Sequence, residues 1–141
     1  MAITFSENIE GFELPEKKKV KGWLTALIEE QGKHLGTIGY LFSDDEFVLE
    51  ANQRYLNHDT YTDIITFDYV EGELISGDIM ISVDRVRDNA EKFDVSFDDE
   101  LHRVIAHGVL HLLGQGDKTE KEAAEMRKKE EHALSKWHEI K

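Results

Sequence analysis

The sequence predicts an α+β domain in which helices surround a small mixed sheet of about four strands. Segments with apolar residues at helical spacing are interspersed with short runs rich in β-branched and aromatic residues, and these runs cluster along the chain. The 141 residues are 40% hydrophobic and 33% charged, which suits a globular chain with one hydrophobic core. We therefore expect a single domain over residues 1–141.

The first elements expected are a short strand, a helix and a second strand. Residues 3–5, with the sequence ITF, have strand character. A helix is expected to begin near Pro15, because proline suits a helix start, and to end at Gly32. Residues 35–43, LGTIGYLFS, follow as a strand. The apolar residues at helical spacing in the helix are Val20, Trp23, Leu24, Leu27 and Ile28.

The next helix is expected to start at a capping box, SDDE at Ser43–Glu46, and to run to about Tyr55. In a capping box, the first and last side chains each accept a hydrogen bond from a backbone N–H that the helix leaves unpaired. The elements expected after it are a loop, a strand, a turn, a strand and a helix, at residues 57–61, 62–70, 71–73, 77–83 and 84–92.

The last two helices carry clear end signals. Ser96 suits the N-cap of a helix that Gly114 ends, since glycine readily takes the left-handed conformation found just after a helix. A second capping box, TEKE at Thr119–Glu122, begins a charged final helix that extends to Trp137.

The composition excludes several classes of protein. The chain has no cysteine, which excludes disulfides, cysteine zinc sites and thiol nucleophiles. No apolar run is long enough to cross a bilayer, and the N-terminus lacks the order of a secretion signal, so we expect a cytoplasmic protein without a membrane partner. Seventeen basic against thirty acidic residues give a net charge of −13, which argues against broad nucleic-acid binding, and we expect no DNA partner.

A metal site is predicted by the segment HGVLHLLGQGD, residues 107–117. His107 and His111 stand four residues apart, so they project within about 40° of each other on a helix. The glycine stop at Gly114 allows a sharp turn that can bring Asp117 to the same ion. Two nitrogens and one oxygen leave a fourth position open, which is the arrangement of a catalytic zinc.

Gly108 separates this site from that of a zinc protease. Zinc proteases with this helix geometry (zincins) have a glutamate directly after the first histidine, where it serves as general base. The chain has Gly108 there, so peptide hydrolysis would lack its usual proton acceptor. We therefore expect a zincin-like metal-site helix without protease chemistry.

Three segments together resemble the YbeY family of bacterial ribosomal RNA maturation endoribonucleases. HGVLHLLGQGD is similar to the family signature His-Gly-x-Leu-His-Leu-x-Gly-x-x-His, TDIITFDY at Thr62–Tyr69 to its Thr-Asp-Val-Leu-Ser-Phe strand, and GDIMISVDRVRDNA at Gly77–Ala90 to its Gly-Asp-Ile-x-Ile-Ser segment. The likeness covers roughly Asn52 to Lys118, about half of the chain. It implies one α+β domain, one divalent metal ion, usually zinc, and cleavage of single-stranded RNA in small-subunit ribosomal RNA processing and ribosome quality control.

The chain departs from the family at two positions. Asp117 stands where the family has its third histidine; a carboxylate is a competent zinc ligand, but it favours oxygen-preferring ions more than histidine does. Leu56 stands where the family has an arginine that is expected to face the scissile phosphate. Either another cation replaces it, with Arg54 and Lys118 as candidates, or the metal alone stabilises the phosphate; Arg54 would point to a different side of its helix. His58, in the same loop, is a candidate proton donor or phosphate contact.

The leading hypothesis is a metal-dependent endoribonuclease. Its catalytic residues would be His107, His111, Arg54 and His58, and its metal ligands His107, His111 and Asp117. The expected partners are single-stranded ribosomal RNA and the small ribosomal subunit, and the oligomeric state stays open. The alternatives are a non-catalytic ribosome assembly factor with a structural metal and, less favoured, a metal-dependent peptidase.

Overall fold

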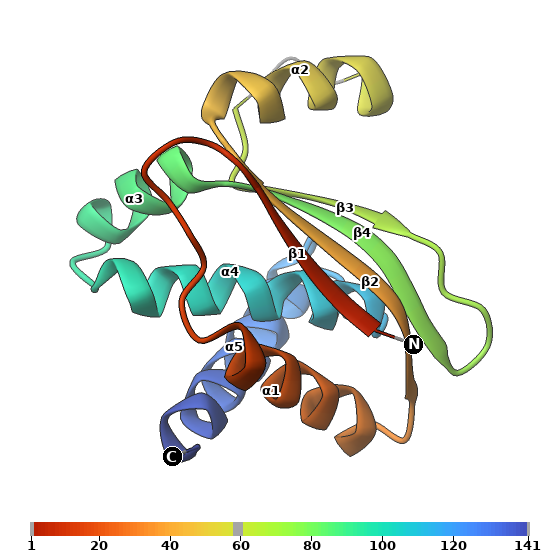
Figure 1. Cartoon of the computed structure of the whole chain (residues 1–141). Helices are drawn as coiled ribbons and strands as arrows, with labels where there is room; N and C mark the ends of the chain where they lie inside the picture. Colours follow the sequence, from red (N-terminus) through yellow and green to blue (C-terminus); the bar gives the residue numbers. More distant parts are fainter. Residues whose placement is uncertain (1, 58–60, 141) are drawn as a thin grey trace.

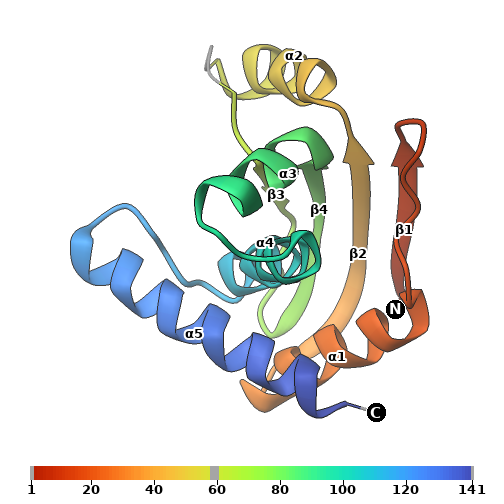
Figure 2. The ribbon, with the colours of Figure 1, turned by 90° about the vertical axis from the view of Figure 1, so that its left-hand side faces the viewer.

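The architecture is a four-stranded sheet with four helices on one face and a fifth helix over one end of the other face (Figures 1 and 2). The structure is a computed structural model that describes residues 2–57 and 61–140. The sheet has the order β1-β2-β4-β3, in which β1, β2 and β4 are parallel and β3 is antiparallel to β4. The strands are β1 Ala2–Asn8, β2 His34–Ser43, β3 Ile64–Asp68 and β4 Leu74–Ser82. The predicted mixed sheet of four strands is confirmed.

The main core lies between the sheet and the helices α1, α3, α4 and α5. Successive side chains of a strand point to opposite faces, so alternate residues of β2 and β4 enter this core. They are Ile38, Tyr40 and Phe42 in β2, and Ile75, Ile79 and Ile81 in β4. The covering helices are α1 Lys17–Glu30, α3 Val83–Lys92, α4 Phe97–Leu112 and α5 Glu120–Glu139.

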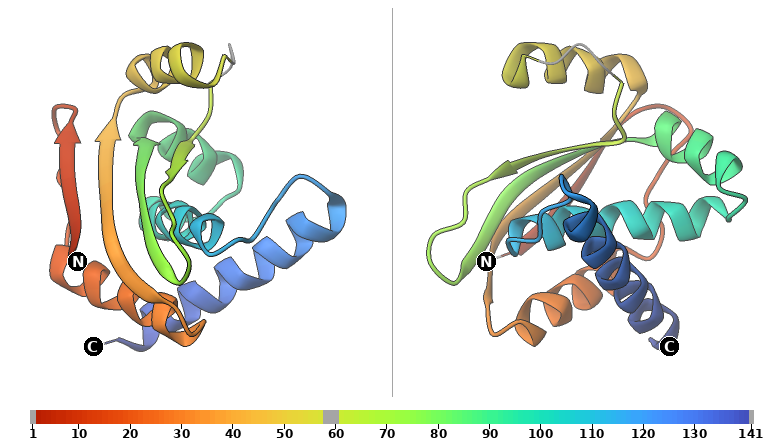
Figure 3. Two further views of the ribbon diagram at one scale, coloured as in Figure 1. Left: turned by 90° about the vertical axis from the view of Figure 1, so that its right-hand side faces the viewer. Right: turned by 180° about the vertical axis from the view of Figure 1, so that it is seen from behind.

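The opposite face of the sheet is covered only in part. There α2, Asp45–Leu56, packs Val48 and Ala51 on Ile65, with Phe67 and Met80 beside them. Figure 3 shows α2 over one end of the strands, away from α1, α4 and α5. A residue of α2 therefore lies on the far side of the sheet from α4.

Helix ends follow the sequence signals with one correction. Ser96 accepts a hydrogen bond from the Asp99 backbone N–H, and the Thr119 capping box forms with both of its bonds. Gly114 has φ +100° just after α4, as expected for a glycine stop. The cap of α2 is Asp44, whose Oδ1 accepts from the Phe47 backbone N–H at 2.8 Å, so the predicted box starting at Ser43 is wrong.

The correction at Ser43 follows from the sheet. Ser43 is the last residue of β2, fully buried and paired with Ser82 of β4 and Asn8 of β1, so it cannot turn into the helix start. Strand lengths also differ from expectation: β1 and β4 are longer than predicted, and β3 is shorter at both ends. None of the helices in the described part of the chain is long and apolar enough to cross a membrane.

Two glycines set how closely α4 lies on the sheet. A Cβ at Gly108 would stand 2.8 Å from Ile79 Cδ1 and 3.2 Å from Ile64 Cδ1, and a Cβ at Gly77 would stand 2.8 Å from Leu112 Cδ2. The Tyr40 hydroxyl also donates to the Ile105 carbonyl at 2.7 Å. The helix that carries the predicted metal ligands is therefore held in backbone-close contact with β4.

Gly108→Ala should destabilise the fold despite the higher helix propensity of alanine. Overpacking a core costs about 1–3 kcal/mol, whereas alanine gains up to about 1 kcal/mol over glycine in a helix. We expect urea unfolding to show a net loss of about 1–2 kcal/mol. Gly22→Ala in α1, where a Cβ would meet no atom within 4 Å, is the matched control and should be stabilising. Equal effects of the two substitutions would contradict the close approach.

His102 is enclosed by tryptophans where α4, α1 and α5 meet. Its ring lies 4.0 Å from that of Trp137 and 5.9 Å from that of Trp23, and its exposed fraction is 5%. Trp23 Nε1 donates to the Ala133 carbonyl at 2.8 Å, which ties α1 to α5. Within the described residues, neither ring nitrogen of His102 has a hydrogen-bond partner. Burial lowers the pKa of His102, although the carboxylates of Asp98, Glu16 and Asp99 act in the opposite direction.

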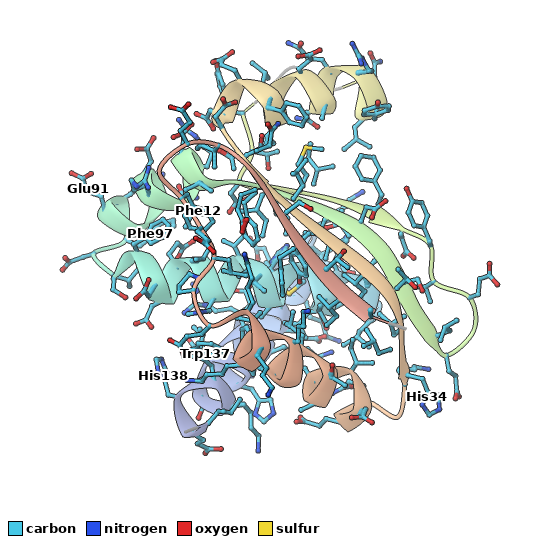
Figure 4. The ribbon with its side chains drawn as sticks, in the orientation of Figure 1. Phe12, His34, Glu91, Phe97, Trp137 and His138 are labelled. Carbon is cyan, nitrogen blue, oxygen red and sulfur yellow. The ribbon has the colours of Figure 1, made fainter. Side chains whose placement is uncertain are left out.

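This lowered pKa predicts acid sensitivity. Below the ordinary histidine pKa of about 6.5, the unfolded chain binds a proton that folded His102 does not. The free energy of unfolding therefore decreases as the pH is lowered. We expect His102→Phe to reduce the stability lost between pH 7.5 and 5.5, by up to about 1.4 kcal/mol per pH unit. His34→Gln, at the exposed start of β2 and far from Trp137 (Figure 4), should keep the wild-type dependence. The same pH dependence in all three proteins would refute the role of His102.

Candidate metal centre

The last two turns of α4 present the two histidines of the predicted site. Their rings are nearly parallel, with an interplanar angle of 11° and a centroid separation of 6.3 Å. The loop after Gly114 returns toward α4, so that Asp117 Oδ2 lies 3.3 Å from His107 Nε2. The helix spacing and the glycine turn thus bring all three predicted donors to one end of α4.

The donor set suits a divalent ion. Two ligands of a tetrahedral zinc ion, each about 2.0–2.2 Å from it, stand roughly 3.4 Å apart, close to the 3.3 Å between His107 Nε2 and Asp117 Oδ2. The ring centroids of His107 and His111 are 6.3 Å apart, and within the described ranges no three His, Asp or Glu side chains are close enough together to hold a metal ion. The residues fit a metal by their chemistry and by one ligand-to-ligand distance, whereas the three side chains together are not gathered around one point.

His111 takes its orientation from the backbone. The Gln115 carbonyl lies 3.2 Å from His111 Nδ1, so Nδ1–H donates to it and Nε2 is left with its lone pair. Gln115 is buried, and its amide donates to the carbonyls of Gly116 at 2.9 Å and Glu122 at 3.2 Å. The loop that carries Asp117 is therefore anchored to the first turn of α5.

His107 takes its orientation from a side chain on α5. Glu130 Oε2 lies 2.7 Å from His107 Nδ1, and Glu130 Oε1 accepts from Arg103 Nη1 at 3.1 Å. Glu130 was not among the residues predicted for the site, because it lies 23 residues beyond His107 in another helix. One signal was present, because Glu130 stands at a position of α5 whose helical neighbours are buried, namely Met126, Ala133 and Trp137.

Carboxylates dominate the electrostatics around His107. Burial acts to lower the pKa of His107, but the hydrogen bond and charge of Glu130, with the charges of Asp117 and Asp63, raise it above the ordinary value. Asp63, just before β3, is affected in turn: burial raises the pKa of its carboxyl group, and His107 opposes this shift. The carboxylates that raise the pKa of His107 would also stabilise a bound cation.

A cleft of about 490 Å³ opens beside His107, between β3, α4 and α5. Phe93 and Val95 form an exposed apolar rim, with exposed fractions of 57% and 42%. The charged residues that line the cleft, apart from His107, are Asp63, Glu100, Arg103, Arg127, Glu130 and Glu131. Arg103 is bound to Glu130, whereas Arg127 has no ion pair with any residue that the structure describes.

The other predicted catalytic residues do not join this cleft. Arg54 lies on α2, on the far side of the sheet, where it pairs with Glu50 at 3.2 Å and lines a separate hollow with Phe47. Leu56, at the family's arginine position, ends α2 and is 42% exposed. His58 lies outside the described residues.

Comparisons with known proteins agree with the motif. The family model described as "Endoribonuclease YbeY" matches residues 5–138. The chain is similar to proteins of that name from Parabacteroides distasonis, with 52% identity over 96% of this chain and 95% of the relative, and from Bacteroides thetaiotaomicron, with 48% identity over 96% and 98%. The protein from Porphyromonas gingivalis (strain W83) is 51% identical over 89% of this chain and 84% of its own length.

A solved structure has the same fold. The solution structure of TM1509 from Thermotoga maritima matches with a TM-score of 0.67 over 96% of this chain and 88% of that chain, at 24% identity. The identity is too low to carry more than the fold. The family match over residues 5–138 and the identity of about one half to whole relatives, however, establish that this chain belongs to the YbeY family of endoribonucleases.

Proposed function

We propose that the protein is a metal-dependent endoribonuclease that cuts single-stranded RNA, acting in small-subunit ribosomal RNA maturation and ribosome quality control. The observation that carries the proposal is the 3.3 Å approach of His107 Nε2 and Asp117 Oδ2, with His111 one helical turn from His107, in a chain of the YbeY family. His107 also lines a cleft. The small ribosomal subunit is the proposed partner, and the cytoplasm the proposed location.

The residues of the centre would hold one divalent ion, which we expect to be zinc. When bound, such an ion supplies Lewis-acid activation of a phosphoryl oxygen and of a water molecule. His107 and His111 would ligate through Nε2, since Nδ1 of each faces an acceptor, Glu130 and the Gln115 carbonyl respectively. Asp117 adds a harder, anionic donor that favours oxygen-preferring ions more than a third histidine would.

Arg127 is a further candidate for the cation that meets the scissile phosphate. It lines the cleft next to His107 and is not held in an ion pair within the described residues. Arg54 stays a candidate for holding RNA away from the cleft, because its hollow lies under α2. A positive charge beside the phosphate stabilises the charge that develops in the transition state.

A second candidate function is a non-catalytic ribosome assembly factor with a structural metal. It is favoured by the acidic cleft lining, in which Asp63, Glu100, Glu130 and Glu131 outnumber two arginines. Peptidase chemistry is disfavoured because position 108 faces Ile79 and Ile64 of the sheet, so no carboxylate could reach the centre from there.

The endoribonuclease proposal is tested by cleavage of single-stranded RNA with highly purified protein. We expect cleavage to stop with a chelator, to return on addition of zinc, and to fall at least about 100-fold in His111→Ala because the ion loses a ligand. Circular dichroism checks that the variant is folded. Equal cleavage in untreated, chelated and variant samples would indicate a contaminating nuclease, and a folded, metal-loaded protein without cleavage would favour the assembly factor.

The phosphate cation is tested by Arg127→Gln and Arg54→Gln in parallel. If Arg127 faces the scissile phosphate, kcat/KM for a short RNA should fall about tenfold or more in Arg127→Gln, with zinc affinity unchanged. Arg54→Gln should change kcat/KM for the same short RNA by less than about twofold, because it removes only an exposed pair with Glu50. The reverse order of effects would assign the role to Arg54.

A further inference from the structure

We propose that Glu130 is a positioning residue, which fixes the ring of His107 in the tautomer that leaves Nε2 free to bind a metal. The inference rests on the metal centre proposed above. It assigns a role in that centre to α5, a helix that carries none of the three ligands.

Each carboxylate oxygen of Glu130 has one hydrogen-bond partner. Oε2 lies 2.7 Å from His107 Nδ1, and Oε1 accepts from Arg103 Nη1 at 3.1 Å. A carboxylate can only accept at Oε2, so the proton between the two groups belongs to Nδ1 of His107. The other ring nitrogen, Nε2, then faces Asp117 Oδ2 at 3.3 Å, which is where the metal would bind.

Burying the Glu130 carboxylate costs free energy of folding. Glu130 is 9% exposed, at a position where α5 otherwise buries apolar side chains. A buried carboxylate destabilises a fold unless its oxygens are paired. An apolar side chain at position 130 would instead extend the buried stripe of Met126, Ala133 and Trp137. A carboxylate that accepts from the second nitrogen of a ligating histidine is the usual means of fixing such a ligand, so the position of Glu130 has a functional reason.

The two histidines are oriented by different means. His111 Nδ1 faces a backbone carbonyl, that of Gln115, which side-chain substitution does not remove. His107 Nδ1 faces a side chain, so its partner can be changed while His111 stays as an internal reference. This difference allows a sharp test.

Glutamine at position 130 should reverse the tautomer of His107. Glu130→Gln has almost the same shape but offers one acceptor and one donor. Because Arg103 can only donate, the amide oxygen is expected to face Arg103 and the NH₂ group to face His107 Nδ1. Nδ1 must then accept, which places the ring proton on Nε2, where the metal would bind. The double variant Glu130→Gln, Arg103→Met frees the amide to turn, so that its oxygen can again accept from Nδ1–H.

The experiment measures two quantities on the full chain. Zinc affinity is measured by competition with a chromophoric chelator, and the protonated ring nitrogen of His107 and His111 by side-chain ¹⁵N NMR of the metal-free protein, above the pH at which both rings are neutral. Glu131→Gln is the control, since Glu131 is the adjacent residue, is exposed and lines the same cleft. Glu130→Ala removes the acceptor altogether.

The expected results follow from the hydrogen bonds. Zinc affinity should fall about 10- to 100-fold in Glu130→Gln and Glu130→Ala, recover in part in the double variant, and stay within about twofold in Glu131→Gln. The His107 proton should lie on Nδ1 in the wild type and on Nε2 in Glu130→Gln, with His111 unchanged. A role in folding alone would lower stability without moving the proton or giving recovery in the double variant.

The outcomes separate this inference from the proposed function. If the wild type binds zinc and folded Glu130 variants bind it equally well, the inference is overturned and the metal centre stands. If the wild type binds no zinc, the metal centre fails, and the inference fails with it as a role in metal binding. If Glu130→Ala does not fold, the zinc affinity and the position of the His107 proton in Glu130→Gln and in the double variant decide whether the inference holds.

Discussion

The contact between α4 and the sheet is the constraint on which the rest of the structure depends. Gly108 and Gly77 remove the side chains that would hold the helix and β4 apart, and Tyr40 fixes the distance with a hydrogen bond to the Ile105 carbonyl. The face of α4 that carries Gly108 therefore packs against the sheet in the core. His107, on another face, is left at the edge of the sheet where the cleft opens, and His111 follows it one helical turn later.

The charge of the protein has to be considered locally. The net charge of −13 opposes nucleic-acid binding by the surface as a whole. Around His107, however, the carboxylates of Glu130, Asp117 and Asp63 raise the pKa of the imidazole and favour any cation that binds there. In the proposed function, this acidic centre would attract a metal ion, and the charges of the ion and of Arg127 would offset the repulsion of a phosphate by the carboxylates.

The parts of the structure that the sequence predicted are those set by local interactions. Ser96, Gly114 and the Thr119 capping box act within one helix turn, and each forms as expected. Ser43 was misjudged because pairing with Asn8 and Ser82, distant in sequence, keeps it in the sheet. Similarly, the three predicted ligands lie in one eleven-residue stretch, whereas Glu130 reaches His107 only through the packing of α5 on α4. The position of Arg54 depended on which face of the sheet α2 covers, which helical spacing alone does not determine.

The dependence of both imidazoles on α5, direct for His107 and through Gln115 for His111, has a consequence for how the protein is made. The ribosome synthesises the chain from its N-terminus, so both histidines and Asp117 leave it before Glu130 does. Until α5 has emerged and docked, neither the Glu130 contact nor the anchoring of Gln115 to Glu122 exists. A nascent chain at that stage would carry all three proposed ligands yet lack a preorganised centre, and the centre would mature only once α5 has docked.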